Sequence, residues 1–187
     1  SHGAAAQIKK QFGRDASVIN NAIDHSVFYP PSVKKRTSGI AVAMVGSEKN
    51  SFKRLEDIKS AVSLLQKDGI NAKLLWITPD EPENPTGTVF VNPPQAQIAD
   101  ILRTADFYVC ASLYESFSLP VLEAMACGCA VITTANSGVL EYAVDGVNCL
   151  TVHMKRPHDI AQKIYDTLKD PDLYVRLSEE GIKTARR

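Results

Sequence analysis

Two carboxylates eight positions apart, Glu115 and Glu123, are the residues with the clearest chemical potential in this sequence. They lie in YESFSLPVLEAMACG, between an apolar run that predicts a buried strand over residues 106–111 and an apolar helical pattern that opens at Pro120. The first N–H groups of a helix have no partner within it, so we expect an anion site over residues 117–121, proline excepted. Such donors, flanked by carboxylates that accept from hydroxyl groups, suit a sugar nucleotide.

The stretch ESFSLPVLEAMACGCAVITT resembles the E-x7-E signature of retaining, nucleotide-sugar-dependent glycosyltransferases of family 4, which have the two-domain GT-B fold. The usual pattern is close to EGFGLPxLEAMAxGxPVI followed by a Gly-rich turn and an acidic residue, and NSGVLEYAVDGVNCLTV matches that continuation. The resemblance implies that Glu115 lies near the anomeric centre of the donor sugar and that Glu123 binds the ribose hydroxyls. We expect Glu123 in the first helical turn, where the helix dipole also favours a carboxylate. Gly138 and Glu141 match an element beside the donor site, and we assign them structural roles first.

The same resemblance implies a basic group for the donor pyrophosphate. Lys53 matches the family lysine, and we expect it to act with Glu115 in catalysis. Ser47 stands where the family has an arginine, and Arg54 replaces a glycine, so Arg54 or Lys49 could supply the lost charge. The residues expected to bind the donor are Ser47, Arg54, Asn92, Ser116, Phe117, Ser118, Leu119 and Glu123.

Ser116 and Ser118 also depart from the family pattern, because both stand where glycines are common. Glycine lets the backbone approach a ligand closely, whereas serine adds a hydroxyl and a steric constraint. The two hydroxyls could bind donor phosphate or sugar, or cap the helix.

Alternating apolar strands and helices predict how these residues are positioned. Six short apolar runs, GIAVAMVGS, AKLLWIT, TVFVN, DFYVCAS, CAVITT and CLTV, are separated by helical patterns. One helix should bury a face of Leu55, Ile58, Val62 and Leu65, a short helix should cover residues 138–144, and two helices should end the chain at about 157–169 and 172–186. This order predicts an α/β fold, a Rossmann-like doubly wound parallel sheet of about six strands.

The first thirty residues predict a boundary between domains. VINNAIDHSVFYP resembles the segment that links the two domains in this family, although Asn20 and Ala22 depart from its pattern. We therefore interpret residues 1–30 as the tail of an N-terminal domain plus the linker, and residues 31–187 as the donor-binding domain. The missing N-terminal domain would hold the acceptor. The basic run at 34–36 is interpreted as a solvated connection.

Composition excludes several classes of protein. The 187 residues carry 21 basic and 21 acidic side chains, so the chain lacks the basic footprint of a nucleic-acid partner. No membrane span or signal peptide is visible, and the four cysteines, none in a CxxC, are expected to be small buried apolar residues. We expect a cytoplasmic protein, whose full-length form could bind peripherally to the membrane face. The histidines lack ligand spacing, so no metal and no cofactor besides the nucleoside-diphosphate sugar is expected.

The sequence therefore favours the donor-binding domain of a retaining hexosyl- or deoxyhexosyltransferase that acts on a glycan or lipid-linked acceptor and needs its other domain for transfer. A non-catalytic nucleotide-binding or regulatory module is the first alternative, since Ser47 replaces an arginine. A GT-B sugar-nucleotide epimerase is the second. The base, the sugar, the acceptor and the oligomeric state stay open.

Overall fold

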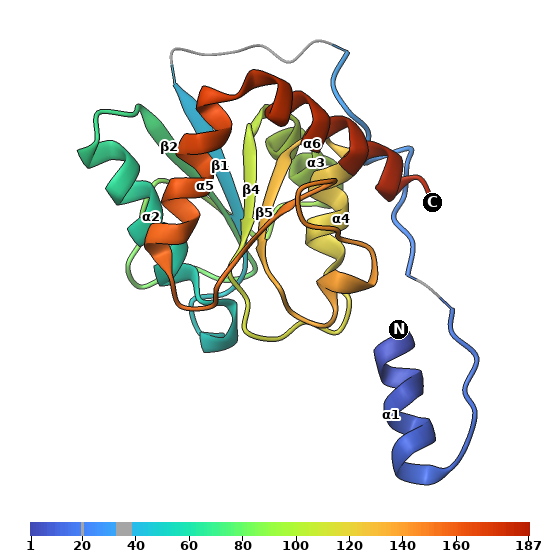
Figure 1. The fold of residues 1–187 in the computed structure, drawn as a ribbon. Coiled ribbons are helices and arrows are strands. Elements are labelled where there is room, and N and C mark those ends of the chain that lie inside the picture. Colours follow the sequence, from blue (N-terminus) through green and yellow to red (C-terminus); the bar gives the residue numbers. More distant parts are fainter. Residues whose placement is uncertain (20, 33–38) are drawn as a thin grey trace.

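The computed structural model describes residues 1–19, 21–32 and 39–187 (Figure 1). Its helices are α1 (His2–Phe12), α2 (Leu55–Lys67), α3 (Gln95–Thr104), α4 (Leu119–Ala126), α5 (Pro157–Lys169) and α6 (Pro171–Ala185). Its strands are β1 (Ile40–Val45), β2 (Ala72–Thr78), β3 (Thr88–Val91), β4 (Phe107–Cys110), β5 (Ala130–Thr134) and β6 (Leu150–Val152). Two single 3₁₀ turns are η1 (Ser51–Lys53) and η2 (Val139–Glu141). Asn20 and the basic run at 34–36 lie outside the described residues.

The six strands form one parallel sheet in the order β3-β2-β1-β4-β5-β6. The chain builds outward from β1 through β2 to β3, then returns to the other side of β1 for β4. All strand residues of β4 and β5 are buried, as expected of parallel strands covered on both faces. The predicted doubly wound α/β sheet is confirmed.

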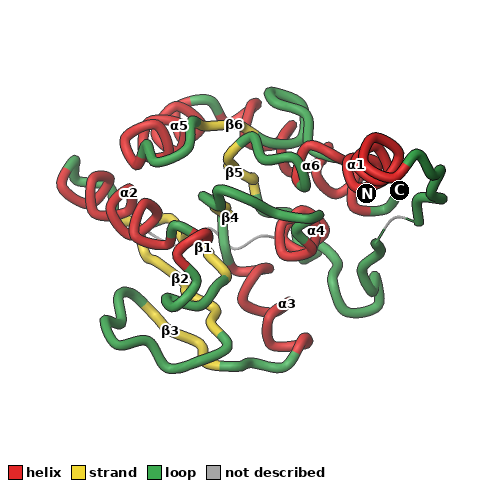
Figure 2. The backbone as a smooth tube through the Cα atoms, turned by 90° about the horizontal axis from the view of Figure 1, so that it is seen from below, coloured by secondary structure: helices red, strands yellow, loops and turns green. Residues whose placement is uncertain are grey.

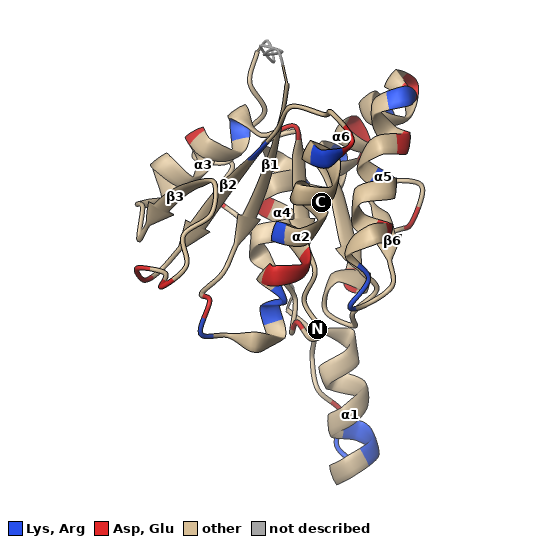
Figure 3. Cartoon of the chain, turned by 90° about the vertical axis from the view of Figure 1, so that its left-hand side faces the viewer, with Lys and Arg blue, Asp and Glu red and all other residues tan. Residues whose placement is uncertain are grey.

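Helices cover both faces of this sheet (Figure 2). Helices α2 and α5 pack on one face, where the predicted apolar stripe of α2 is buried together with Trp76, whose indole N–H donates to Gly46 O at 2.9 Å. Helices α3 and α4 pack on the other face, against alternate side chains of the same strands such as Ala43 and Val131. Charged residues lie mainly on helices and connecting segments (Figure 3). Among the described residues, no helix combines the length and apolarity that a bilayer span requires.

Helix α6 crosses the amino ends of the strands and packs on α4 (Figure 1). Gly181 allows this contact, because a Cβ there would lie 3.3 Å from the Met125 side chain. Residues 24–30 also pack against this side of the fold. Phe28 is buried, and the Arg103 guanidinium donates to Val27 O at 3.0 Å and stacks over the Tyr29 ring. This segment is therefore anchored to the sheet domain through α3 and α4.

Two local expectations need correction. The short helix predicted at residues 138–144 is only the single turn η2, because the amide of Val144 donates instead to the Asn148 side chain at 2.7 Å. Helix α4 begins at Leu119, so Glu123 lies beyond its first turn and gains little from the helix dipole.

Candidate functional site at the carboxyl ends of β1 and β4

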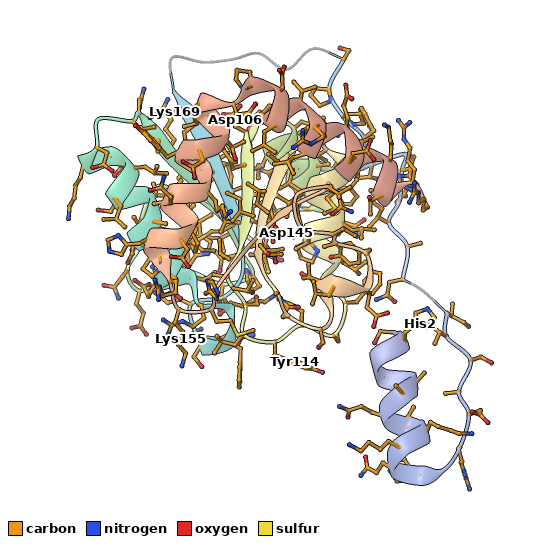
Figure 4. All side chains as sticks on the ribbon, in the orientation of Figure 1. His2, Asp106, Tyr114, Asp145, Lys155 and Lys169 are labelled. Carbon is orange, nitrogen blue, oxygen red and sulfur yellow. The ribbon has the colours of Figure 1, made fainter. Side chains whose placement is uncertain are left out.

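The strand order reverses between β1 and β4, and the loops that follow these two strands meet at the carboxyl edge of the sheet. In open α/β sheets this crevice is where ligands bind. The two loops are joined directly, since the amide of Leu113 donates to Phe52 O at 2.8 Å. In Figure 4, Tyr114 marks the position of the β4–α4 loop on this lower edge.

Lys53 and Glu115 meet at this junction although 62 positions separate them. Lys53 Nζ lies 2.7 Å from Glu115 Oε1, and the two side chains are only 24% and 12% exposed. The same oxygen accepts a hydrogen bond from Ser112 Oγ at 2.7 Å. Glu115 Oε2 accepts from no described residue, so one oxygen of this oriented carboxylate is left for a ligand hydroxyl.

The start of α4 presents donors without partners beside this ion pair. The backbone N–H groups of Phe117, Ser118 and Leu119 donate to no described group. Val121 was expected to have a free N–H as well, but it donates to Ser118 O at 3.2 Å because the first turn closes on that carbonyl. The anion site predicted from the sequence is thus three N–H groups rather than four.

Ser118 holds this turn in a left-handed conformation, with φ 67° and ψ 71°. Its carbonyl also accepts the Tyr142 hydroxyl at 2.8 Å, and the Tyr142 ring packs on Phe117 at 5.1 Å between centroids. Gly138 lies so close that a Cβ there would fall 2.3 Å from Glu115 O and 2.6 Å from Phe117 N. Gly138 is therefore needed for packing, in agreement with its assigned structural role.

Glu123 extends from α4 as a half-buried carboxylate with no described hydrogen-bond or ion-pair partner. Burial removes water from this group and raises its pKa above the ordinary glutamate value. A desolvated carboxylate without a partner can accept two hydroxyl donors from a ligand.

The remaining predicted donor-site residues have other partners or lie apart. Ser47 Oγ donates to Asp80 at 3.1 Å, and Lys49 Nζ lies 3.1 Å from the same carboxylate. Lys49 and then Ser47 lower the pKa of Asp80. Arg54 makes two hydrogen bonds to Asp57, of 2.9 and 2.7 Å, in the first turn of α2.

Asn92 follows β3 with φ 44°, and no described contact joins it to the Lys53–Glu115 pair. Ser116 is exposed and Leu119 is 37% exposed, whereas Phe117 is buried. In the described ranges, no group of three or more His, Cys, Asp or Glu side chains is arranged to hold a metal ion.

Sequence reasoning missed Ser112, the buried hydroxyl that orients Glu115. A polar residue directly after a buried strand, at the carboxyl edge, was the available signal. It also missed the partner of Glu141, whose carboxylate accepts the backbone N–H groups of His2 and Gly3 at 2.9 Å each. Figure 4 shows His2 at the start of α1, a helix with no buried residue.

Residues 80–184 match the family model described as glycosyl transferases group 1. This chain belongs to that family. The match contains Glu115 and Glu123 but stops short of Lys53. The chain is 29% identical over 141 residues to sucrose synthase 5 of Arabidopsis thaliana, covering 73% of this chain and 16% of that protein. It is 27% identical over 204 residues to alpha-maltose-1-phosphate synthase of Mycolicibacterium smegmatis, covering 91% of this chain and 51% of that protein.

Solved structures share the fold. The C-terminal domain of the group 1 family protein LpcC from Francisella tularensis aligns with a TM-score of 0.72 at 25% identity, covering 88% of this chain and 97% of that one. Anabaena Alr3699/HepE, solved with UDP and glucose, aligns with a TM-score of 0.81 at 16% identity, covering 99% and 56%. This chain thus spans about half the length of HepE and of the M. smegmatis relative. The sheet is the Rossmann-like fold of GT-B C-terminal domains.

Proposed function

We propose that this chain is the donor-binding domain of a retaining glycosyltransferase of family 4, which moves a hexose or deoxyhexose from a nucleoside-diphosphate sugar to a glycan or lipid-linked acceptor. The observation that carries the proposal is the Lys53–Glu115 pair, 2.7 Å apart, beside the start of α4, where three N–H groups have no described acceptor. This arrangement provides a cation and N–H donors for phosphate. It also holds the Glu115 carboxylate through one oxygen, so that the other oxygen can accept from a sugar hydroxyl.

The donor diphosphate would lie between the N–H groups of residues 117–119 and Lys53. Glu123 would accept hydrogen bonds from the two ribose hydroxyls, which gives its desolvated carboxylate the partners that the described residues do not supply. Glu115 would use its free oxygen on a sugar hydroxyl and stabilise positive charge that develops at the anomeric carbon.

In the reaction, the bond from the anomeric carbon to the diphosphate oxygen breaks while the acceptor oxygen bonds to the same face of the sugar. The acceptor proton passes to the departing diphosphate, so the domain needs no general base of its own. Lys53 and the α4 N–H groups stabilise the negative charge on that leaving group, as fixed donors do without reorganising. On this proposal catalysis needs no metal.

Residues 1–30 would be the tail of the acceptor-binding domain plus the linker, and transfer would require that domain. The M. smegmatis relative and HepE are each about twice as long as the part that this chain matches, and the HepE structure holds UDP and glucose, so uridine is the first base to test. The cytoplasmic location, with peripheral membrane association of the full-length enzyme, stays a prediction.

A non-catalytic nucleotide-binding module is the second candidate, and a specific observation favours it. Ser47 carries no charge, Arg54 is paired with Asp57 and Lys49 with Asp80, so none of the three adds a free cation to the proposed diphosphate site. An epimerase would be favoured only if an isomerised sugar nucleotide appeared without acceptor.

Calorimetric titration of this chain with UDP, GDP and dTDP, without metal, tests the site. We expect one nucleotide to bind, Glu123→Ala to abolish that binding, and Glu179→Ala, an exposed change on α6, to leave it intact. Binding that survives Glu123→Ala would contradict the assignment of the ribose site. No binding of any nucleotide would contradict a donor-binding role for this chain.

Catalysis is tested separately in the full-length enzyme with Glu115→Ala. Unchanged turnover would refute the catalytic role of Glu115 and favour the module.

A further inference from the structure

Lys59 is a largely buried lysine on α2, outside the ion pair that carries the candidate site. Its side chain is only 9% exposed, and its Nζ lies 2.7 Å from Glu56 Oε1 and 3.3 Å from Glu48 Oε1. The same ammonium lies 4.3 Å from the centre of the Trp76 ring. A buried charge is costly unless it is paired, and a cation over an indole ring gains a further favourable contact. Lys59 is therefore held in one place by groups from three different segments.

A series of contacts leads from Trp76 to the candidate site. The buried indole N–H of Trp76 donates to the carbonyl of Gly46, the residue directly after β1, at 2.9 Å. A Cβ at Gly46 would lie 3.2 Å from Lys53 Cγ, so the backbone there packs on the stem of that lysine. Lys53 Nζ in turn lies 2.7 Å from Glu115 Oε1. The position of Lys53 therefore depends on the backbone that Trp76 holds.

Glu48 fastens the same loop from its outer side. One oxygen of Glu48 accepts from Lys59, and the other accepts the backbone N–H groups of Glu83 and Asn84 at 2.9 and 3.4 Å. Lys59 also donates to Asn84 O at 3.4 Å. The loop after β1 is thus tied to the β2–β3 connection, and Lys59 takes part in both routes.

This arrangement prepares a positive charge for a ligand. A lysine has a flexible stem with much rotamer freedom, and ordering that stem on binding would weaken its contact with a phosphate. The Lys53 ammonium is instead held at Glu115 before a ligand binds. Lys59 is not placed to bind the ligand itself, because its ammonium is already paired with two carboxylates. Its effect on binding would have to pass through the loop that carries Lys53.

We infer that Lys59 is a positioning residue of the donor site, which acts on a nucleoside diphosphate through Lys53. Lys59 fixes the loop after β1 through Trp76 and Glu48, so that the Lys53 ammonium meets the diphosphate without reorganising. The inference rests on the proposed function, because it assumes that a nucleoside diphosphate binds at Lys53. Neighbouring contacts alone do not establish such coupling, which has to be measured as an interaction between the two lysines.

A double-mutant cycle on binding tests whether Lys59 acts through Lys53. The wild-type chain is titrated calorimetrically with UDP, GDP and dTDP, and the nucleotide that binds is then used for Lys59→Met, Lys53→Met and the double variant. We expect Lys59→Met to weaken binding about fivefold and Lys53→Met about tenfold. In the Lys53→Met background, Lys59→Met should change the affinity by less than about twofold, because its route to the ligand is gone. Lys67→Met, at the exposed end of α2, is the matched lysine control and should leave binding intact.

Two controls separate positioning from loss of the fold. Trp76 is the only tryptophan in the chain, so its fluorescence through a urea titration shows whether Lys59→Met is folded around α2. Glu48→Ala cuts the outer route at a partly exposed loop residue and carries the test if Lys59→Met does not fold. We expect Glu48→Ala to weaken binding about threefold, and only while the Lys53 ammonium is present.

The outcomes of these titrations are distinct. Unchanged binding in the folded Lys59→Met and Glu48→Ala chains would overturn the positioning role of Lys59 and leave the proposed function standing. An equal loss of affinity with and without the Lys53 ammonium would show that Lys59 acts by another route, and would also overturn it. A wild-type chain that binds none of the three nucleotides would instead overturn the proposed function, and the inference with it.

Discussion

The Lys53–Glu115 pair should couple the two loops of the site energetically, and a double-mutant cycle measures that coupling. Exposed ion pairs contribute about 0.2–1 kcal/mol, whereas a hydrogen bond to a charged group contributes about 1.5–3 kcal/mol. With a separation of 2.7 Å and exposures of 24% and 12%, this pair lies between those classes. We therefore expect a coupling free energy of about 1.5 kcal/mol.

The cycle compares the wild type with Lys53→Met, Glu115→Gln and the double variant in urea unfolding at pH 7. Each single change should lower the free energy of unfolding by roughly 1–2 kcal/mol, and the double variant should lose less than the sum of the two. Losses of this size leave the domain folded, so any loss of activity reports on the site. Because the pair is largely shielded from solvent, 0.5 M NaCl should reduce the coupling only slightly.

A coupling below about 0.5 kcal/mol would refute the reasoning, since the pair would then behave as an ordinary surface contact. A coupling that disappears in salt would show that Lys53 and Glu115 are more exposed in solution than their geometry implies. Lys183→Met with Glu180→Gln, an ion pair of the same 2.7 Å length on α6 with exposures of 58% and 34%, is the exposed control cycle.

Three further predictions concern single groups. Burial raises the pKa of Glu123, so its stabilising contribution is complete below the unfolded-state value and is lost as pH rises through the folded-state value. Glu123→Gln should therefore raise the melting temperature at pH 7, weaken UDP binding, and lose its stability advantage as pH falls toward 4; equal melting temperatures at pH 7 would contradict this. Glu141→Ala removes the acceptor of the His2 and Gly3 amides, so hydrogen exchange in α1 should quicken while global stability changes by less than about 1 kcal/mol, and unchanged exchange would count against the contact. Burial raises the pKa of Cys127 to about 12, so iodoacetamide at pH 8 should label it in urea but not in the native chain, as mass spectrometry of the peptide would show.

The fold could be predicted from local patterns in the sequence because each pattern is compatible with only one kind of element, a helix or a strand. The Leu55, Ile58, Val62 and Leu65 stripe has helical spacing and is buried as predicted, and AKLLWIT forms β2 over the same residues. Boundaries were less certain, because a difference of one residue at the start of α4 moved Glu123 out of the first turn. The predicted helix over residues 138–144 is reduced to the turn η2 because the Asn148 side chain accepts the Val144 amide, and the helix propensities of the residues in that stretch do not account for such a contact.

The candidate site was only partly predictable, for a different reason. The Arg54–Asp57 pair has the i, i+3 spacing of helical ion pairs and could have been anticipated from the sequence. The pairing of Ser47 with Asp80 and the orientation of Glu115 by Ser112 depend on how separate loops meet, which no local pattern encodes. The resemblance placed Lys53 and Glu115 in one site. It did not predict that Lys53 and Ser112 both bind the same oxygen, Glu115 Oε1.

The sheet topology explains why this site contains both satisfied and unsatisfied groups. At the strand-order reversal, two loops from distant parts of the chain converge, so a lysine from one can neutralise a glutamate from the other. Among the described residues α4 has no such complement: the buried hydroxyl of Ser118 at its start and the half-buried carboxylate of Glu123 in its second turn have no hydrogen-bond partner there. Because unpartnered buried groups cost stability, the ligand-free chain should be less stable than its packing allows. A ligand that supplies hydroxyl donors to the half-buried Glu123 carboxylate would remove the cost at that group, and the ribose of a nucleoside diphosphate carries two such hydroxyls.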